Sequence, residues 1–288
     1  MKNFITIFNQ LLNLIPTGKF QKIVEKHDGD KYVKKFKTFH HLITLLYGQI
    51  TEKDSLRDIQ HPLNLEKNRL QFFSLPEIKK STLADANNNR KSKIFEDLFY
   101  ELLKKTQELT PKHKFKFKNP LFSLDSTTIK LCLNTFDWAK FRTAKGAIKI
   151  HTKLNHSGNI PDFLVITDGK CADITGVKTT FDFSPDSIIV FDKGYIDFEW
   201  LFSLHKKGVF FVTRAKDNMA YHVTGQHAFT EGTGVISDDE IALTGQKAAK
   251  YYPEKLRMVK YYDINTNKVY TFITNNFKLA AKTIADIY

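Results

Sequence analysis

The spacing of apolar residues changes within a short basic segment, Thr110 to Pro120, and this change constrains the fold more than any other feature of the sequence. Before the segment, apolar residues recur every three or four positions, as in amphipathic helices. After it, short runs of β-branched and aromatic residues alternate with turn residues, as in strands. We therefore expect an α/β protein with a helical N-terminal module, residues 1–110, followed by a domain of residues 118–288 built on a mixed sheet.

The N-terminal module is predicted to be helical. Helices are expected at residues 4–14, at 38–48, from Ser81 onward and at 94–103. The first of these ends at Pro16-Thr17-Gly18, a sequence that stops helices. His40 and His41 are adjacent on a predicted helix and cannot both face one ligand, so packing is the favoured role for them.

The second half of the chain is predicted to be rich in strands. Strands are expected at residues 121–132, 147–155, 163–167, 187–191 and 209–213, with a helix at 196–206. His156-Ser157-Gly158-Asn159 is a turn sequence that gives two of these strands hairpin spacing. From about 218 to 275, short strand patterns are separated by Gly232, Gly234 and Gly245, which predicts a β-rich insertion.

The charge balance points to a polyanionic partner. The chain has 44 Lys and Arg against 31 Asp and Glu, a formal net charge of +13. Such a surplus attracts phosphate backbones. Charge alone does not distinguish an enzyme that acts on nucleic acid from a basic scaffold protein.

The sequence suggests a cytoplasmic protein. Cys132 and Cys171 lack the spacing of a disulfide framework or a zinc site. The first 16 residues resemble an amphipathic helix rather than a signal peptide, and no apolar window approaches the roughly 20 residues of a membrane span. We therefore expect no membrane partner.

Two carboxylates stand out because each is attached to a predicted strand. Asp125 lies within the first strand of the sheet, and Asp192 directly follows the apolar run Ile188-Ile189-Val190-Phe191. An acid next to such a run is costly to desolvate unless it is paired or binds a cation. Two acids on neighbouring strands would suit Mg²⁺, which accepts few carboxylates and keeps water or phosphate in its other positions. The alternative is that Asp125 caps a strand end and Asp192 forms a turn before Gly194.

Short motifs around these acids carry a family resemblance. They are Leu124-Asp125-Ser126-Thr127-Thr128-Ile129, Trp138-Ala139-Lys140-Phe141-Arg142, Lys145-Gly146-Ala147-Ile148-Lys149-Ile150-His151, Asp168-Gly169, Phe191-Asp192-Lys193-Gly194-Tyr195 and Phe211-Val212-Thr213-Arg214-Ala215-Lys216. In the first module the motifs are Phe36-x-x-Phe39-His40-His41-Leu42, Ser55-Leu56-Arg57-Asp58-Ile59, and Ser81-Thr82-Leu83-Ala84-Asp85-Ala86-Asn87 with Arg90. In this order they resemble the IS-four family of insertion-sequence transposases, of the Asp-Asp-Glu class, along essentially the whole chain.

The resemblance implies a ribonuclease-H-like catalytic core. Asp125 and Asp192 would be the first two catalytic acids and the ligands of Mg²⁺ or Mn²⁺. The third acid is expected in a Tyr-x-x-Arg-x-x-x-Glu motif that begins at Tyr288, so the Glu would fall outside the 288 residues and this chain would be nearly inactive. Glu199 and Glu231 are substitutes on paper, but they lack the motif's context.

The resemblance also implies double-stranded DNA as partner, both transposon ends and target, and a homodimer acting at the bacterial nucleoid. The side chains expected to contact DNA are Lys140, Arg142, Lys145, Lys149, Lys153, Lys193, Tyr195, Arg214, Lys216 and Tyr288. Phosphate contacts would explain the cations. The alternation from Lys149 to Leu154 would equally suit a solvated strand face. The first module is expected to bind the DNA ends.

Two other functions remain open from the sequence. A transposase remnant without catalytic activity would bind DNA and act as a competitor or inhibitor of the full-length enzyme. A general nuclease with a ribonuclease-H-like fold would cleave without preference for transposon ends.

Overall fold

The computed structural model describes residues 2–65, 74–111, 113–131, 140–142, 145–168, 172–178 and 180–288. The chain divides into two compact units, Met1–Glu108 and Leu109–Tyr288, and each is described by itself below. Among the described residues, no helix combines the length and the apolar character that crossing a membrane requires.

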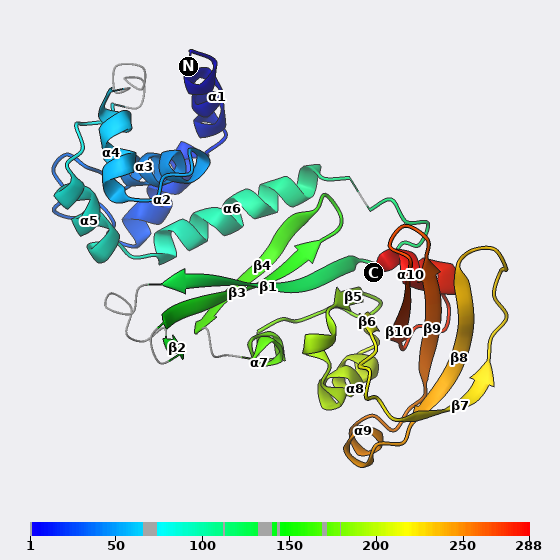
Figure 1. Cartoon of the computed structure of the whole chain (residues 1–288). Helices are drawn as coiled ribbons and strands as arrows, with labels where there is room; N and C mark the ends of the chain where they lie inside the picture. The colour runs from blue at the N-terminus through cyan, green and yellow to red at the C-terminus, as the bar shows by residue number, and fades with distance from the viewer. Residues whose placement is uncertain are drawn as a thin grey trace. The chain divides into compact units, whose positions relative to one another are not determined.

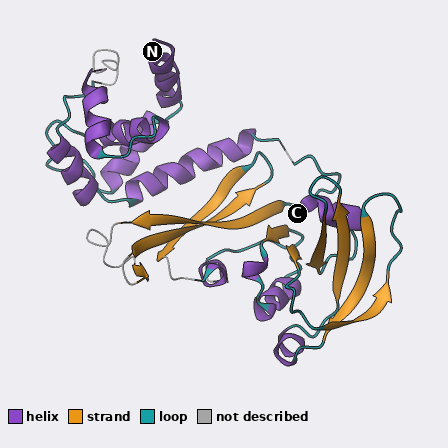
Figure 2. Cartoon of the chain, in the orientation of Figure 1, coloured by secondary structure: helices purple, strands orange, loops and turns teal. Residues whose placement is uncertain are grey.

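The first unit is built from helices joined by loops (Figure 2). The helices are α1 (Lys2–Asn13), α2 (Thr17–Lys26), α3 (Thr38–Ile50), α4 (Leu56–Leu65), α5 (Lys80–Asn89) and α6 (Lys93–Leu109). Each contributes side chains to one hydrophobic core, which includes Phe8, Phe20, Ile43, Leu63, Leu83 and Ile94. A Cβ at Gly48 in α3 would lie 2.6 Å from Ile59 Cδ1, so glycine at this position allows α3 and α4 to pack closely.

Two of the three motif segments of this unit, Phe36 to Leu42 and Ser81 to Arg90, meet in its interior. The buried His41 in α3 forms a hydrogen bond through Nε2 with Asn87 Oδ1 of α5, at 2.6 Å. Burial lowers the pKa of His41 to about 4, so its imidazole is neutral at pH 7. Arg90, just after α5, donates a hydrogen bond from Nη2 to the carbonyl oxygen of Phe36. The packing role predicted for His41 is thus confirmed.

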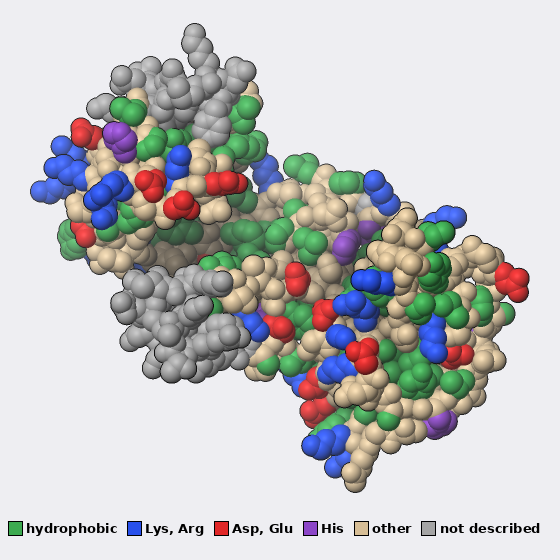
Figure 3. Space-filling view, in the orientation of Figure 1, with side chains coloured by type: hydrophobic (Ala, Val, Ile, Leu, Met, Phe, Trp, Pro, Cys, Tyr) green, Lys and Arg blue, Asp and Glu red, His purple; other side chains and the backbone are tan. Residues whose placement is uncertain are grey.

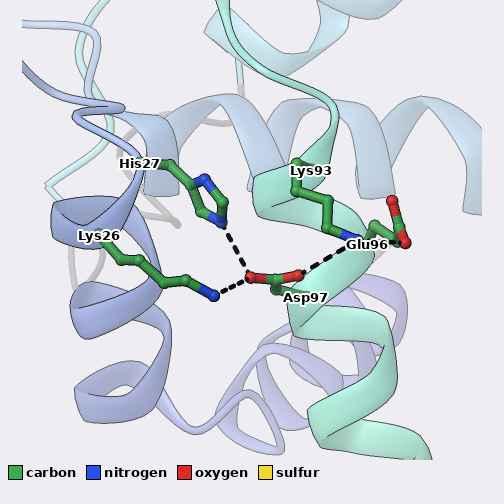
Figure 4. Close-up of polar contacts among 5 residues, drawn as sticks. All are labelled: Lys26, His27, Lys93, Glu96 and Asp97. Atoms are coloured by element: carbon green, nitrogen blue, oxygen red, sulfur yellow. Dashed lines mark hydrogen bonds and ion pairs between the residues drawn. The ribbon is translucent and has the colours of Figure 1, made fainter.

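A carboxylate connects the end of α2 to the start of α6 (Figure 4). Asp97 Oδ2 lies 3.0 Å from Lys26 Nζ and 2.9 Å from His27 Nε2. Lys93 is 3.8 Å from the other carboxylate oxygen and also pairs with Glu96. Hydrogen bonds from His27 and Lys26 lower the pKa of Asp97 to about 2.

The described strands of the second unit form one sheet (Figure 1). Its first part contains β1 (Leu121–Leu131), β2 (Lys140–Arg142), β3 (Lys145–Asn155), β4 (Ile160–Asp168), β5 (Ile188–Phe191) and β6 (Phe210–Arg214). Strands β4, β3 and β1 are antiparallel neighbours, and β5 and β6 follow parallel to β1. This order, β4-β3-β1-β5-β6, is the ribonuclease-H-like arrangement, as predicted.

The predicted β-rich insertion continues the same sheet. It contains β7 (Tyr221–Gln226), β8 (Val235–Leu243), helix α9 (Gln246–Tyr251), β9 (Leu256–Asp263) and β10 (Lys268–Thr274). Its last strand, β10, pairs antiparallel with β6, and β9, β8 and β7 follow outward. The insertion is therefore anchored beside β6.

Helices cover both faces of the central strands. Helices α7 (Asp173–Lys178), α8 (Phe198–Lys206) and α10 (Ala281–Ile287) complete the described core. Ile189 and Phe191 of β5 pack in the cluster that includes Leu201 of α8, whereas Ile188 and Val190 pack in the cluster that includes Ile284 of α10. Burial on both faces explains why all four residues of β5 are apolar.

Candidate active site

The two predicted catalytic acids occupy matching positions on neighbouring strands. Strands β1 and β5 are parallel, and Leu124 pairs with Phe191. Asp125 follows Leu124 within β1, and Asp192 follows Phe191 directly after the end of β5, so the usual spacing between strands predicts backbones about 5 Å apart. Both carboxylates are exposed. The sheet thus brings together two acids that are 67 residues apart in the sequence.

Strand alternation directs both acids toward the same face of the sheet. Asp125 continues the side of Leu121, and Asp192 continues the side of Val190, and both of these apolar residues pack in the α10 cluster. The contacts of Asp192 agree with this orientation. Asp192 pairs with Arg214, and the guanidinium of Arg214 lies over the ring of Tyr288, the residue directly after α10. The acids therefore lie at the exposed end of the face that α10 covers.

Asp192 is held by a backbone amide and by an arginine. The Gly194 N–H donates to Asp192 Oδ1 at 3.0 Å, and Arg214 Nη2 donates to Oδ2 at 3.1 Å. The amide of Gly194 lowers the pKa of Asp192, burial opposes this, and Arg214 lowers it further. The carboxylate is therefore ionised at neutral pH. Asp125 accepts a hydrogen bond from the Ser126 amide at 2.8 Å.

Arg214 lies between the acids and a small aromatic cavity. The cavity, of about 350 Å³, is lined by Arg214, Tyr261, Asp263, Tyr270, Phe272, Ala285 and Tyr288. The guanidinium carbon lies 5.5 Å from the centre of the Tyr288 ring and 6.0 Å from that of Tyr270. The hydrogen bond to Asp192 raises the pKa of Arg214, and burial raises that of Tyr288. Arg214 is thus protonated and carries a positive charge at the edge of the site.

A second polar network lies behind Asp125 and includes an acid that the sequence analysis missed. Asp173 Oδ1 accepts hydrogen bonds from Ser126 Oγ at 2.7 Å and from Lys149 Nζ at 2.9 Å. Burial raises the pKa of Asp173, but these two donors outweigh it and the net shift is downward. The position of Asp173, at the start of a short helix five residues after Asp168 of the Asp168-Gly169 motif, is the signal that could have identified it.

The fully buried His151 supports this network from β3. Its Nε2 lies 2.9 Å from Thr167 Oγ1. A Cβ at Gly176 would lie 2.7 Å from the same nitrogen, so glycine lets α7 approach β3 closely enough to place Asp173. Burial raises the pKa of Tyr195, and the charges of Asp173, Asp125 and Asp192 raise it further.

The residues expected to contact DNA have varied surroundings. Lys149 pairs with Asp173, and Lys153 pairs with Asp162 at 2.6 Å and lies 5.0 Å from the centre of the Phe122 ring. Lys193 pairs with Asp217 at 3.2 Å, Lys216 donates to the Ile196 carbonyl at 3.1 Å, and Tyr195 is 2% exposed. Strand β2 contains Lys140 and Arg142, and β3 begins at Lys145, but the structure does not describe these three side chains. Trp138 lies outside the described residues.

The donor set is suited to an open Mg²⁺ or Mn²⁺ site rather than to a closed one. Within the described residues, no group of three or more His, Cys, Asp and Glu side chains could hold a metal ion. Two exposed carboxylates at one register suit a hard cation that keeps water and phosphate in its other positions. Glu199 lies in the first turn of α8 and Glu231 lies in the turn after β7, and neither forms such a group with the two acids.

Sequence comparisons associate both units with known families. The family described as "Transposase DDE domain" matches residues 116–288, and a domain of unknown function, DUF4372, matches residues 4–73. A Sinorhizobium fredii protein described as a transposase, y4zB, is 31% identical over 212 residues, covering 72% of this chain and 57% of that protein. A Geobacillus stearothermophilus protein described as the transposase of insertion element IS5377 is 25% identical over 219 residues, covering 75% and 56%. The chain thus spans a little over half the length of these relatives.

A comparison of structures gives a weaker likeness. A cryo-EM structure of the piggyBac transposase synaptic complex with hairpin DNA aligns with 94% of this chain and 59% of that chain. The sequence identity is 12% and the TM-score is 0.40.

Proposed function

Because the chain belongs to the transposase DDE domain family, we propose that it is an insertion-sequence transposase that cleaves DNA at terminal inverted repeats and joins the freed ends to target DNA. The observation that carries this proposal is the register of β1 and β5, which pairs Leu124 with Phe191, the residues directly before Asp125 and Asp192. Enzymes of this family act on phosphodiester bonds, and two aligned acids on one sheet edge are suited to that chemistry.

Asp125 and Asp192 would hold Mg²⁺ or Mn²⁺ between their carboxylates. When bound, the metal activates the attacking water or 3′ hydroxyl and stabilises the leaving oxygen. The protein contributes a rigid mount, since β1 and β5 are anchored by cores on both faces. The Gly194 amide holds one oxygen of Asp192 and fixes the orientation of that carboxylate.

Arg214 would move between two partners in this site. In the free protein it neutralises Asp192, whose carboxylate a metal ion needs. Arginine binds phosphate oxygens as readily as carboxylates. A DNA phosphate arriving at the site would take Arg214 and leave Asp192 available to the cation. Lys193 and Lys216, from the segments that follow β5 and β6, would add phosphate contacts. Since Tyr195 is buried, we leave it out of the proposed DNA surface.

A third carboxylate would complete the pair. We propose that it is the Glu of the Tyr-x-x-Arg-x-x-x-Glu motif whose first residue is Tyr288, and that cleavage needs this Glu as well as Asp125 and Asp192. Tyr288 lies 39% exposed beside Arg214, where a ring can reach a DNA strand. A homodimer on paired ends and binding of the ends by the helical unit are further parts of the proposal.

The test is a nicking assay on duplexes that carry the element's ends, in Mg²⁺ and in Mn²⁺. A chain extended through the expected Glu should nick the ends. Asp125→Asn and Asp192→Asn should each lower the rate about 1000-fold, equivalent to about 4 kcal/mol of transition-state stabilisation, with DNA binding nearly unchanged. Asp186→Asn, an exposed position in a turn, is the matched control.

Three outcomes would contradict parts of this proposal. Nicking at a normal rate by the 288 residues would remove the need for the third acid. Full activity of either Asn variant would exclude that acid from the chemistry. Binding of the ends without cleavage by the extended chain would favour a non-catalytic competitor, and cleavage without preference for ends would favour a general nuclease.

A further inference from the structure

The helical unit contains a cavity between the loop that precedes α3 and one face of α5. Its volume is about 750 Å³. It is lined by Val33, Lys34, Lys35, Phe36, Pro76, Glu77, Lys79, Thr82, Asp85, Ala86, Asn89 and Arg90. The catalytic residues proposed above all belong to the other unit, so this cavity has no role in that chemistry.

One stripe of α5 forms a wall of the cavity. Thr82 and Ala86 are four residues apart and share a helix face with Asp85 and Asn89, and Arg90 follows directly after the helix. The remaining motif residues have other roles, since Leu83 is in the core and Asn87 is bonded to His41. Thus packing explains part of the motif Ser81 to Arg90, including the buried Ala86, and it does not explain Thr82 and Asp85, which line the cavity.

The charge of the lining is positive. Four cations, Lys34, Lys35, Lys79 and Arg90, face two acids, Glu77 and Asp85, which leaves a formal charge of +2. The three lysines are exposed, and Figure 3 shows Lys and Arg side chains gathered on the side of this unit where α5 lies. A concave surface with one sign of charge concentrates counter-ions of the opposite sign.

Arg90 adds hydrogen-bond donors that lack acceptors. Its Nη2 donates to the Phe36 carbonyl, and its guanidinium carbon lies 5.3 Å from the centre of the Phe36 ring. Its Nε and Nη1 are buried and have no hydrogen-bond partner among the described residues. The carboxylate of Asp30 interacts electrostatically with Arg90, but it already accepts hydrogen bonds from the backbone amide and the hydroxyl of Thr38. A buried guanidinium in this state is unfavourable, and an anion with several oxygens would relieve it.

We propose that this cavity binds a phosphate group of the DNA backbone, with Arg90 at its wall and Lys34, Lys35 and Lys79 at its rim. The DNA part of this inference rests on the proposed function. A phosphodiester at the wall would be attracted by the charge of the Arg90 guanidinium, and a run of backbone places further phosphates near the lysines, which are exposed donors. The helical unit would thereby hold DNA by its backbone, whatever the base sequence.

The test measures binding of the whole 288-residue chain to a labelled 30-base-pair duplex across a range of KCl concentrations. The variant Lys34→Gln/Lys35→Gln/Lys79→Gln removes the rim. Lys22→Gln/Lys104→Gln/Lys105→Gln removes the same charge from exposed positions on α2 and α6 that lie outside this cavity. Each lost phosphate contact lowers the slope of log K against log salt by about 0.9. We expect the rim variant to lose about 2 in slope and to bind roughly 10- to 100-fold more weakly at 150 mM salt, and the control variant to change less than about threefold.

Arg90→Gln should weaken binding as well, and circular dichroism will show whether it still folds. If it does not fold, the rim variant carries the test, because its three lysines are exposed. Equal weakening of DNA binding in the two triple variants would overturn the proposal, because only the total charge would then matter.

Titration with inorganic phosphate, followed by calorimetry, tests free phosphate as the other source of the same group. The rim variant could lose phosphate binding while the two triple variants bind DNA with the same affinity. That result would assign the cavity to free phosphate and overturn the DNA assignment. Failure of the wild-type chain to bind any duplex would defeat the proposed function and, with it, the DNA part of this inference.

Discussion

Two aspartate–arginine pairs lie in the same sheet and differ in almost every respect. Asp238 of β8 and Arg257 of β9 form two hydrogen bonds, of 2.7 and 2.6 Å, with side chains 1% and 5% exposed. Arg257 also donates to the carbonyls of Asn276 and Leu279. Asp192 and Arg214 share a single hydrogen bond of 3.1 Å, with side chains 54% and 37% exposed.

The difference separates a structural pair from an exchangeable one. A buried, fully bonded pair cannot lose one member without leaving a charge stranded in the interior. An exposed pair is weak because water competes with it. Arg214 can therefore leave Asp192 when a phosphate arrives, whereas Arg257 stays with Asp238 and fixes the segment that follows β10.

Replacing each arginine in turn should show the largest difference in stability between the two pairs. Arg257→Met should lower the free energy of unfolding by about 3–5 kcal/mol, because Asp238 remains buried without a partner. Arg214→Met should cost less than about 1 kcal/mol. Urea denaturation of both variants measures the two values, and similar losses would show that burial does not distinguish the pairs.

Neutralising Lys145, Lys149 and Arg214 together should flatten the salt dependence of DNA binding. We expect the triple variant to bind roughly 10- to 100-fold more weakly at 150 mM salt. Lys149→Gln alone should change the slope least, because Asp173 already neutralises Lys149. Fluorescence anisotropy across KCl concentrations tests this, and an unchanged slope in the triple variant would remove these residues from the interface.

Removing Arg214 should make the metal site easier to fill. Arg214→Gln frees the carboxylate of Asp192, so the chain should bind Mn²⁺ roughly threefold to tenfold more tightly, equivalent to about 1 kcal/mol of charge repulsion. Electron paramagnetic resonance of free Mn²⁺ measures this without any cleavage. Lys255→Gln, which removes an exposed cation paired with Glu240, serves as the control, and equal affinities in the two variants would count against the exchange.

The smallest effect is expected at Asp97, whose burial lies between that of the two aspartates above, with 19% of its side chain exposed. Its pKa in the folded chain is about 2, below the ordinary value of 3.8. The carboxylate therefore stabilises the helical unit above about pH 4, and this contribution is lost as the pH falls from about 4 to 2. Asp97→Asn should be less stable than the wild type at pH 6, by less than about 1 kcal/mol, and equally stable near pH 2. A difference that persists at pH 2 would assign the effect to packing.

The sequence predicted the central strands because local pattern determines them. The run Ile188 to Phe191 is apolar on both faces of the sheet, and the predicted strand differs from β5 by one residue. The same pattern identified Asp192, because an acid directly after a buried strand is unusual. Pairing of Asp125 with that position followed from the family resemblance.

Contacts between distant segments could not be predicted in this way. Asp173 matters because α7 packs against β3, and Asp238 because β8 and β9 pair, and neither fact leaves a local pattern. Tyr195 was expected to contact DNA from its place beside Asp192, but its ring lies within the core. Helices α2 and α4 were not predicted, since α2 has few apolar positions and α4 contains Pro62.

The return of β10 to pair with β6 has a consequence for how such proteins diversify. The excursion through β7, β8 and β9 begins after β6 and returns beside it within the same sheet, so the turns at its outer strands, β7 and β8, are separated from the acids by β6, β10 and β9. Residues added or lost at those turns would leave the alignment of β1 with β5 untouched. Related proteins could therefore acquire new surfaces at strands β7 and β8 while the two acids keep their alignment.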